Sequence, residues 1–260
     1  MKQALLMLLA LGPCLGCSKQ PEKPRRTEPW LASAAPSASA APATQAVLEL
    51  RFSQESSIRF SLPAKNAKPS GQLPVASGKL RLDTRDLKNS SATIDADLMW
   101  IAIEPDSLPP NAELPGSPSA SALNWLELGS EVAAERREQF ALARFELTAL
   151  ENLSAAALDL DAKRPARVRA TAVGTLLIHG FRAPVRAEVQ LESLPPGPAG
   201  QLRVTIRSVS PLVLPLAPHE IAARGPSGVL DPQQSARAAG SVGKNARIEL
   251  ALVAESVVSR

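Results

Sequence analysis

The sequence is poor in aromatic residues. Phenylalanine, tryptophan and tyrosine together make up 3% of its 260 residues, and tyrosine is absent altogether. Surfaces that stack sugars or single-stranded nucleic acids need exposed rings, so this composition argues against both. The formal net charge is only +4, and lysine and arginine are dispersed along the chain. Such a charge pattern is typical of a solvated surface, so we expect no nucleic-acid partner.

Cysteine is confined to the start of the chain, at Cys14 and Cys17. Beyond Cys17 there is therefore no disulfide, no cysteine zinc ligand and no thiol nucleophile. The two histidines, His179 and His219, are too few for the three or four convergent ligands of a metal site, so we predict that they lie on the surface. An alternative role for His219 is a polar contact at the mouth of a pocket.

Sequence patterns of catalytic sites are also missing. No Gly-x-Ser-x-Gly sequence occurs, which argues against a serine hydrolase of the α/β type. Residues 225–228 (Gly-Pro-Ser-Gly) have the composition of a turn rather than of a phosphate-binding loop. The sequence therefore predicts a protein that is not an enzyme, with no metal ion and no cofactor other than a bound lipid.

The first 17 residues have the pattern of a secretory signal peptide. Lys2 supplies a positive charge, and an unbroken apolar run over residues 4–11 follows it. This run is too short to span a bilayer, which takes about 20 residues, but it has the length of a signal-peptide core. Gly12 and Pro13 then end the run. We therefore predict a signal peptide over residues 1–17.

The end of this segment, Gly16-Cys17, resembles the lipobox of bacterial lipoproteins. The resemblance implies that a diacylglyceryl group is attached to the Cys17 thiol, that the chain is cleaved before this residue and that the new amine is acylated. Cys14 stands where leucine is usual. Acylation of Cys14 instead would put Pro13 at the cleaved bond, so we favour Cys17. An ordinary signal peptide that is cut elsewhere is the alternative.

Two or three acyl chains on Cys17 would anchor the protein stably to a membrane. Ser18 follows it in place of aspartate, which by the same resemblance favours the outer membrane. We therefore expect a lipid-anchored protein of the cell envelope that faces the periplasm. Residues 18–46 are rich in proline, alanine and serine, a composition that buries too little apolar surface to fold. They are predicted to form a disordered tether to a folded domain over residues 47–258.

This folded domain is predicted to consist mainly of β-strands. Apolar and polar residues alternate with a period of two in several segments, as is typical of strands with one buried face. The predicted strands lie within 47–52, 57–62, 78–83, 92–103, 143–150, 168–172, 185–192, 202–206 and 248–252. Turns such as 179–184 and 195–200 link them in sequence, which favours an antiparallel meander closed as a barrel or packed as a sandwich. One helical segment is expected between Ser121 and Gln139, after a loop over 105–121.

Four segments of the domain resemble motifs of the YceI-like family, in the expected order. Residues 57–60 (SIRF) resemble its opening strand, 123–145 its helix and following strand, 173–185 (VGTLLIHGFRAPV) a hairpin, and 242–248 (VGKNARI) its closing strand. The resemblance implies an antiparallel, eight-stranded, lipocalin-like β-barrel with one or two short helices and a long apolar cavity. It also implies an isoprenoid lipid as the ligand.

We predict that inward-facing side chains of these strands bind the ligand. Several of them are small, which leaves volume for a long apolar molecule such as a polyisoprenoid, a quinone or another lipid. The predicted lining residues are Phe60, Ala170, Ala172, Leu176, Ile178, Val185, Ala187, Val189, Val204, Ile206 and Leu250. The alternative is that large neighbours fill the barrel, which would leave a structural or interaction module of the cell envelope.

Overall fold

The computed structural model describes most of the chain from residue 47 onward. The predicted signal peptide and tether, including Cys17, lie outside the described residues, as do residues 257 and 258 of the predicted domain. None of the helices in the described part of the chain has the length and apolar character needed to cross a bilayer. The described ranges are 47–65, 67–108, 117–160, 165–198, 200–238 and 242–256.

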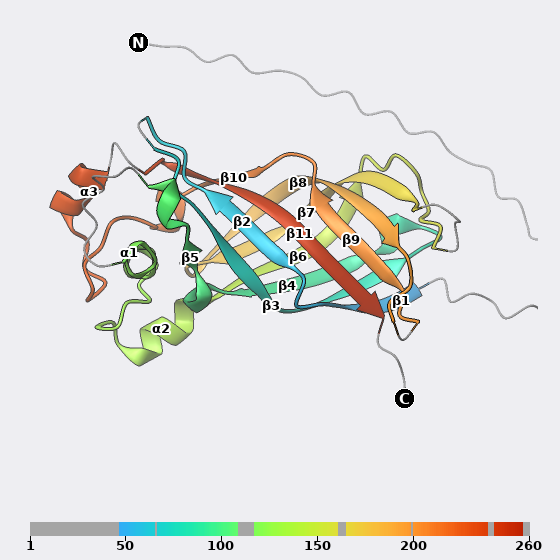
Figure 1. Cartoon of the computed structure of the whole chain (residues 1–260), viewed down its shortest axis with the longest axis horizontal. Helices are drawn as coiled ribbons and strands as arrows, with labels where there is room; N and C mark the ends of the chain where they lie inside the picture. Colours follow the sequence, from blue (N-terminus) through green and yellow to red (C-terminus); the bar gives the residue numbers. More distant parts are fainter. Residues whose placement is uncertain are drawn as a thin grey trace, which may run out of the picture. The chain divides into compact units, whose positions relative to one another are not determined.

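The described residues form one antiparallel sheet that closes on itself (Figure 1). Its strands follow the order β1-β11-β2-β3-β4-β6-β7-β8-β9, and a further pairing between β9 and β11 completes the ring. The strands are β1 (Val47–Phe52), β2 (Ser57–Ser61), β3 (Ser70–Asp83), β4 (Ser91–Asp97), β5 (Ala102–Ile103), β6 (Leu142–Glu151), β7 (Arg167–Ile178), β8 (Phe181–Leu194), β9 (Arg203–Ser208), β10 (Leu212–Pro215) and β11 (Asn245–Ser256).

Eleven strands occupy eight positions around this barrel. β1 and β2 both lie between β3 and β11, so they act as one interrupted strand. In the same way β4 and β5 both pair with β3, and β9 and β10 both pair with β11. The predicted eight-stranded antiparallel barrel is therefore confirmed. Eight strands leave an interior just wide enough for side chains or for one slender ligand.

The alternating sequence pattern corresponds to the pattern of burial. Along β8, Val185, Ala187, Val189 and Leu191 are buried, while the intervening side chains are exposed or half-buried. The hairpin between β7 and β8 is tighter than predicted, because the turn over 179–184 is reduced to two residues. These are His179 and Gly180, with φ of 50° and 81°. Two consecutive positive φ values are those of the type I′ turn, which matches the right-handed twist of paired strands.

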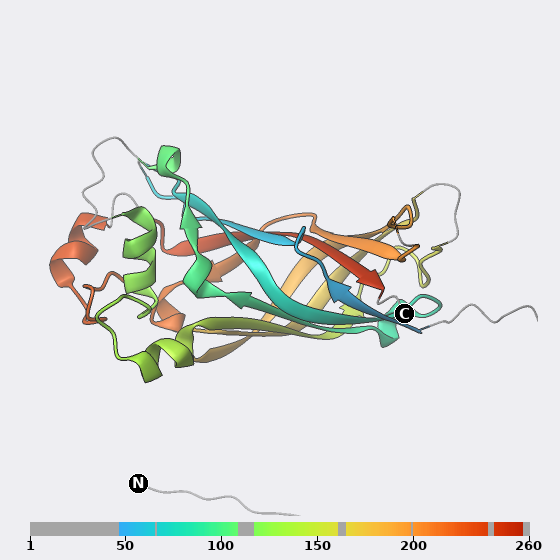
Figure 2. The same ribbon diagram turned by 60° about the horizontal axis from the view of Figure 1, so that its bottom comes forward.

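Helices gather at one end of the barrel, and β1 begins at the other end (Figure 2). The helical segment expected between Ser121 and Gln139 is confirmed, but it is divided into two short helices, because the chain leaves helical geometry at Leu126 and Glu127 has a φ of 57°. A third helix was not expected in a segment with so little apolar periodicity. It follows Asp231, whose carboxylate accepts a hydrogen bond from the Gln233 backbone N–H. The helices are α1 (Pro118–Trp125), α2 (Ala134–Phe140), α3 (Pro232–Ala238) and the 3-10 turns η1 (Leu87–Asn89), η2 (Leu98–Trp100), η3 (Pro105–Ser107) and η4 (Ala217–His219).

The barrel interior divides into two halves. The half that contains the start of β1, which we call the closed half, is filled by a cluster that includes Leu50, Leu82, Leu191 and Val204, each at most 2% exposed. The half beneath the helices, which we call the cavity half, contains two smaller clusters that meet at Ile178. The closed half thus accounts for most of the packed core.

Candidate functional site

A cavity of about 140 Å³ lies in the cavity half. Its wall is apolar except for Ser121. The lining residues are Ile58, Phe60, Leu62, Leu73, Leu98, Ile101, Ile103, Leu108, Pro118, Ser121, Ala122, Trp125, Leu126, Ile178, Leu214, Leu216, Ile221, Val242, Ala246 and Ile248. An apolar concave site with few polar groups is typical of sites for small apolar ligands.

Alternation along the strands directs these side chains inward. Ile58, Phe60 and Leu62 line the cavity at every second position of β2 and its continuation. Phe60 is paired with Gly71 of β3, and its ring occupies the place of the missing side chain. A Cβ atom at residue 71 would lie 2.6 Å from that ring. Gly71 therefore leaves room for the ring of Phe60, which lines the cavity.

The helical cap covers one side of the cavity. Ser117 begins α1 by accepting a hydrogen bond from the Ala120 N–H, and Pro118 follows in the first helical turn. Ala122, Trp125 and Leu126, at spacings of three and four, turn one face of this helix toward the cavity. The cavity thus lies between the barrel strands on one side and α1 with neighbouring loop segments on the other.

Two of the predicted lining residues, Phe60 and Ile178, line this cavity. Leu176 packs against the neighbouring cluster of Leu214, Leu216 and Ala246. Val185 is buried and Leu250 is half-buried, but neither lines the cavity.

The remaining six predicted lining residues lie in the closed half. Ala170, Ala172, Ala187, Val189 and Val204 belong to its packed core, and Ile206 packs against it. Leucines of β1 and β3 belong to the same cluster and fill the volume that the small residues leave. These six residues therefore lie in a packed core and do not line the cavity, which corrects the prediction. Contact between a ligand and the other five predicted residues stays a prediction.

A buried cluster of charged groups lies beside the cavity, centred on Glu127 in the turn between α1 and α2. Its carboxylate, 3% exposed, accepts a hydrogen bond from Nε of Arg136 and lies 3.1 Å from Nη2 of Arg224. Burial by itself raises the pKa of Glu127, but the hydrogen bond from Arg136 and the positive charges of Arg224 and Arg136 together lower that pKa below its ordinary value. Glu127 is therefore a buried carboxylate held in its charged form.

The two histidines belong to the same cluster, so the prediction that they lie on the surface is wrong. His179 is 1% exposed and His219 is 4% exposed. Nδ1 of His179 donates a hydrogen bond to the carbonyl oxygen of His219 at 2.8 Å, and Nδ1 of His219 donates one to the carbonyl oxygen of Pro215 at 2.8 Å. His179 also packs against the ring of Phe140, with 4.4 Å between ring centroids.

The cluster connects three segments that are far apart in the sequence. Glu127 lies in the helical cap, His179 in the β7–β8 turn, and Arg224 donates hydrogen bonds to the carbonyl oxygens of Glu220 and Gly228 after η4. The sequence neighbours Leu126 and Ile178 line the cavity. The cluster therefore fastens the cap to the barrel next to the cavity. Sequence reasoning missed it, although an isolated Glu127 between two leucines is a local sign of a buried charge.

In the described part of the chain, no group of three or more histidine, cysteine, aspartate or glutamate side chains could hold a metal ion. His219 is not among the residues that line the cavity, so the structure does not support its alternative role as a polar contact at the pocket mouth.

No family model matches the sequence, and no curated protein matches it. Among solved structures, the chain is similar to a polyisoprenoid binding domain from Saccharophagus degradans implicated in plant cell wall breakdown, with a TM-score of 0.49 and 12% identity over 81% of this chain and 99% of that chain. It is also similar to BcnA from Burkholderia cenocepacia, with a TM-score of 0.43 and 13% identity over 76% of this chain and 96% of that chain. The strand pairing of this chain, and not these similarities, establishes the eight-stranded barrel. Membership of the YceI-like family stays a prediction.

Proposed function

We propose that the domain binds a long apolar molecule, such as a polyisoprenoid, a quinone or another lipid, and holds part of its chain in the cavity. The observation that supports this proposal most directly is the cavity wall, in which Ser121 is the single polar residue. An apolar chain gains about 0.8 kcal/mol for each methylene group that leaves water. A charged group would find no partner in such a wall, so the polar end of the ligand stays outside.

The cavity volume limits how much of the ligand can enter. A protein cavity of about 150 Å³ with aliphatic walls accommodates benzene, so 140 Å³ suits a group of roughly five or six carbons. The rest of a longer chain therefore stays outside this cavity. The resemblance of four sequence segments to the YceI-like family favours an isoprenoid chain, whose branched units have about this size.

The proposal includes a lipid anchor on Cys17 that holds the barrel at the outer membrane, facing the periplasm. The apolar run over 4–11 and the Gly16-Cys17 sequence support it. An anchored barrel stays close to the membrane that contains its ligand.

Native mass spectrometry of the full protein, purified in a mild detergent, tests the proposal. We expect a species heavier than the processed chain by the mass of an apolar lipid, which organic extraction removes and added solanesol, a long polyprenol, restores. Protein that carries no lipid and binds neither solanesol nor oleic acid would contradict the proposed function.

A second candidate function is a structural or interaction module of the cell envelope. The observation in its favour is the closed half of the barrel, which side chains fill. Six large side chains of its cluster are at most 2% exposed, namely Leu50, Leu80, Leu82, Leu87, Leu191 and Val204. This alternative predicts a protein partner that cross-links as well to the variant Ala122→Phe, in which the cavity is blocked, as to the parent protein. Loss of the partner in that variant would favour the ligand-binding function instead.

A further inference from the structure

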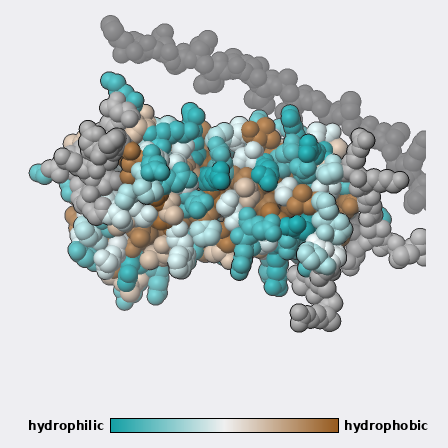
Figure 3. Space-filling view, viewed as in Figure 1, coloured by the Kyte–Doolittle hydropathy of each residue, from teal (hydrophilic) through white to brown (hydrophobic). Residues whose placement is uncertain are grey.

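Exposed large hydrophobic side chains are distributed unequally along the barrel. Among the described residues, eight such side chains are exposed, and seven belong to the cavity half or to the segments that cap it, while Val209 lies near the middle. The closed end has none within the described residues. The side wall, by contrast, mixes hydrophobic and hydrophilic side chains (Figure 3). The eight residues are Met99, Trp100, Leu142, Phe181, Val209, Val213, Val229 and Leu230.

The most exposed of these side chains lie next to the cavity. Trp100, 69% exposed, and Met99 follow Leu98 and precede Ile101, and both of these neighbours line the cavity. Val229 and Leu230 are 68% and 56% exposed and lie on a turn held against the cap, since Gly228 directly before them accepts a hydrogen bond from Arg224. The inner side of this end is thus the cavity wall, and its outer side offers apolar groups to the surroundings.

We propose that this end of the barrel docks on the surface of a lipid bilayer, with Trp100, Met99, Val229 and Leu230 in the interfacial layer. The inference rests on the proposed function, because a ligand drawn from a membrane reaches the cavity most easily from a docked barrel. If the ligand passed through water between the membrane and the cavity, each exposed methylene group would cost about 0.8 kcal/mol. Tryptophan is also the side chain that membrane–water interfaces favour most, since its ring is apolar and its N–H is polar.

The length of chain before β1 is compatible with this orientation. β1 begins at the closed end, so the chain before it joins the barrel at the end opposite the docking surface (Figure 1). The roughly 30 residues between Cys17 and Val47 can extend to at most about 100 Å. The two longest strands, β3 and β8, have 14 residues each, which corresponds to a length of about 46 Å. A lipid on Cys17 therefore allows the cavity end to reach the same membrane.

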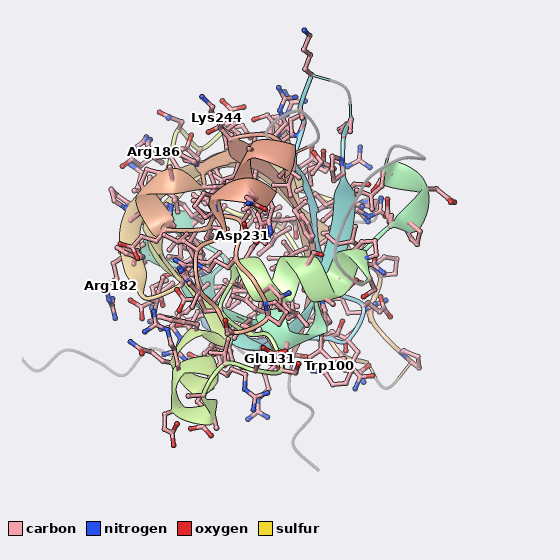
Figure 4. The ribbon with its side chains drawn as sticks, turned by 90° about the vertical axis from the view of Figure 1, so that its left-hand side faces the viewer. Trp100, Glu131, Arg182, Arg186, Asp231 and Lys244 are labelled. Carbon is pink, nitrogen blue, oxygen red and sulfur yellow. The ribbon has the colours of Figure 1, made fainter. Side chains whose placement is uncertain are left out.

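The charges at this end have both signs. Figure 4 looks onto the helical end, with Asp231 near the centre, Lys244 above it, Arg182 to the left, and Glu131 and Trp100 below. A mixed set of charges gives weak net attraction to anionic lipids. We therefore expect docking that depends on the apolar side chains and changes less than twofold with salt.

Single cysteines labelled with an environment-sensitive NBD dye test this proposal, because the domain has no cysteine of its own. The full-length protein is purified from membranes and mixed or reconstituted with phosphatidylcholine vesicles, and the parent protein without a new cysteine supplies the background. The test positions are Met99→Cys and Leu230→Cys. The matched control is Lys88→Cys, an exposed site at the closed end. We expect a blue shift and quenching by brominated lipids at residues 99 and 230 and neither at residue 88.

Equal responses at all three positions, or a response at none, would overturn the docking proposal. The latter result is also what a surface for a protein partner would give. The double variant Trp100→Ser/Leu230→Ser, labelled at Met99→Cys, is a second measurement: we expect at least a threefold loss of quenching by brominated lipids with solanesol affinity in solution unchanged. Since neither residue lines the cavity, unchanged quenching overturns docking alone. A parent protein that carries no lipid and binds neither solanesol nor oleic acid contradicts the proposed function alone.

Discussion

Nε2 of His179 lies 3.5 Å from Oε1 of Glu127, and both side chains are at most 3% exposed. The two residues are 52 positions apart in the sequence, one in a hairpin turn and the other in a turn between helices. Both have positive φ values, of 50° and 57°, which cost of order 1 kcal/mol each for a residue other than glycine. The surrounding ion pairs and hydrogen bonds maintain these conformations and so hold the cap in place.

Replacement of Glu127 by glutamine should destabilise the domain by about 3 kcal/mol, because Arg224 would lose its buried counter-charge. Unfolding in urea, followed by circular dichroism, measures the change. The matched control is Glu131→Gln, an exposed neighbour for which we expect a change within about 0.5 kcal/mol. Equal stability of the two variants would show that the cluster does not hold the cap.

The contribution of Glu127 to stability should depend on pH. Its pKa is lowered in the folded domain relative to the ordinary value of 4.5, so the unfolded chain binds the proton more tightly than the folded one. The stabilisation is therefore complete above about pH 4.5 and is lost as the pH falls through the lower pKa of the folded state. We expect the stability difference between the parent protein and Glu127→Gln to shrink between about pH 7 and about pH 3. A difference that stays constant over this range would be evidence against a charged Glu127.

Blocking the cavity from its cap should weaken ligand binding. Ala122 lines the cavity, so the substitution Ala122→Phe places a ring in the space for the ligand. We expect at least about a tenfold loss of affinity for solanesol, measured by competition with a fluorescent fatty acid. Ala120→Phe, in the same helix but outside the cavity wall, should retain its affinity. Equal affinities in two folded variants would exclude this cavity as the site.

Gly71 should not tolerate a side chain. A Cβ atom there would lie 2.3 Å from the carbonyl oxygen of Ala102 and 2.6 Å from the ring of Phe60, so both β5 and the cavity wall would have to shift. We expect Gly71→Ala to destabilise the domain by about 1–3 kcal/mol in thermal unfolding. Gly225→Ala is the control, since nothing lies within 4 Å of a Cβ atom at that position. A melting temperature unchanged by Gly71→Ala would argue against the close packing of Phe60 on β3.

The predicted anchor has a direct test. Cys17→Ala should abolish incorporation of labelled palmitate and release the protein from membranes, because one thiol receives the diacylglyceryl group. Cys14→Ala is the matched variant and should keep the label. Labelling that persists in Cys17→Ala and disappears in Cys14→Ala would assign the lipid to the other cysteine.

The strands could be predicted from the sequence, because alternation of apolar and polar residues is a local property. That pattern left a barrel and a sandwich open, and only the resemblance to the YceI-like family implied a closed barrel. Every second residue of β8 faces inward whatever its partners are, and this alone predicts a half-buried strand. The break between α1 and α2 could not be predicted from local sequence patterns. It depends on Glu127, whose unusual backbone conformation is stabilised by residues of two other segments.

What the sequence determined by itself is the alternation that produces the sheet and its inward-facing residues. Tertiary structure alone decided which of those residues leave space. Ala170 and Ala187 are small, yet leucines of β1 and β3 occupy the volume beside them, whereas Phe60 and Ile178 border a cavity. Packing is settled by the sum of side-chain volumes across the barrel, and that sum depends on strand register. The same reason explains the buried histidines, which find their hydrogen-bond partners only when distant segments meet.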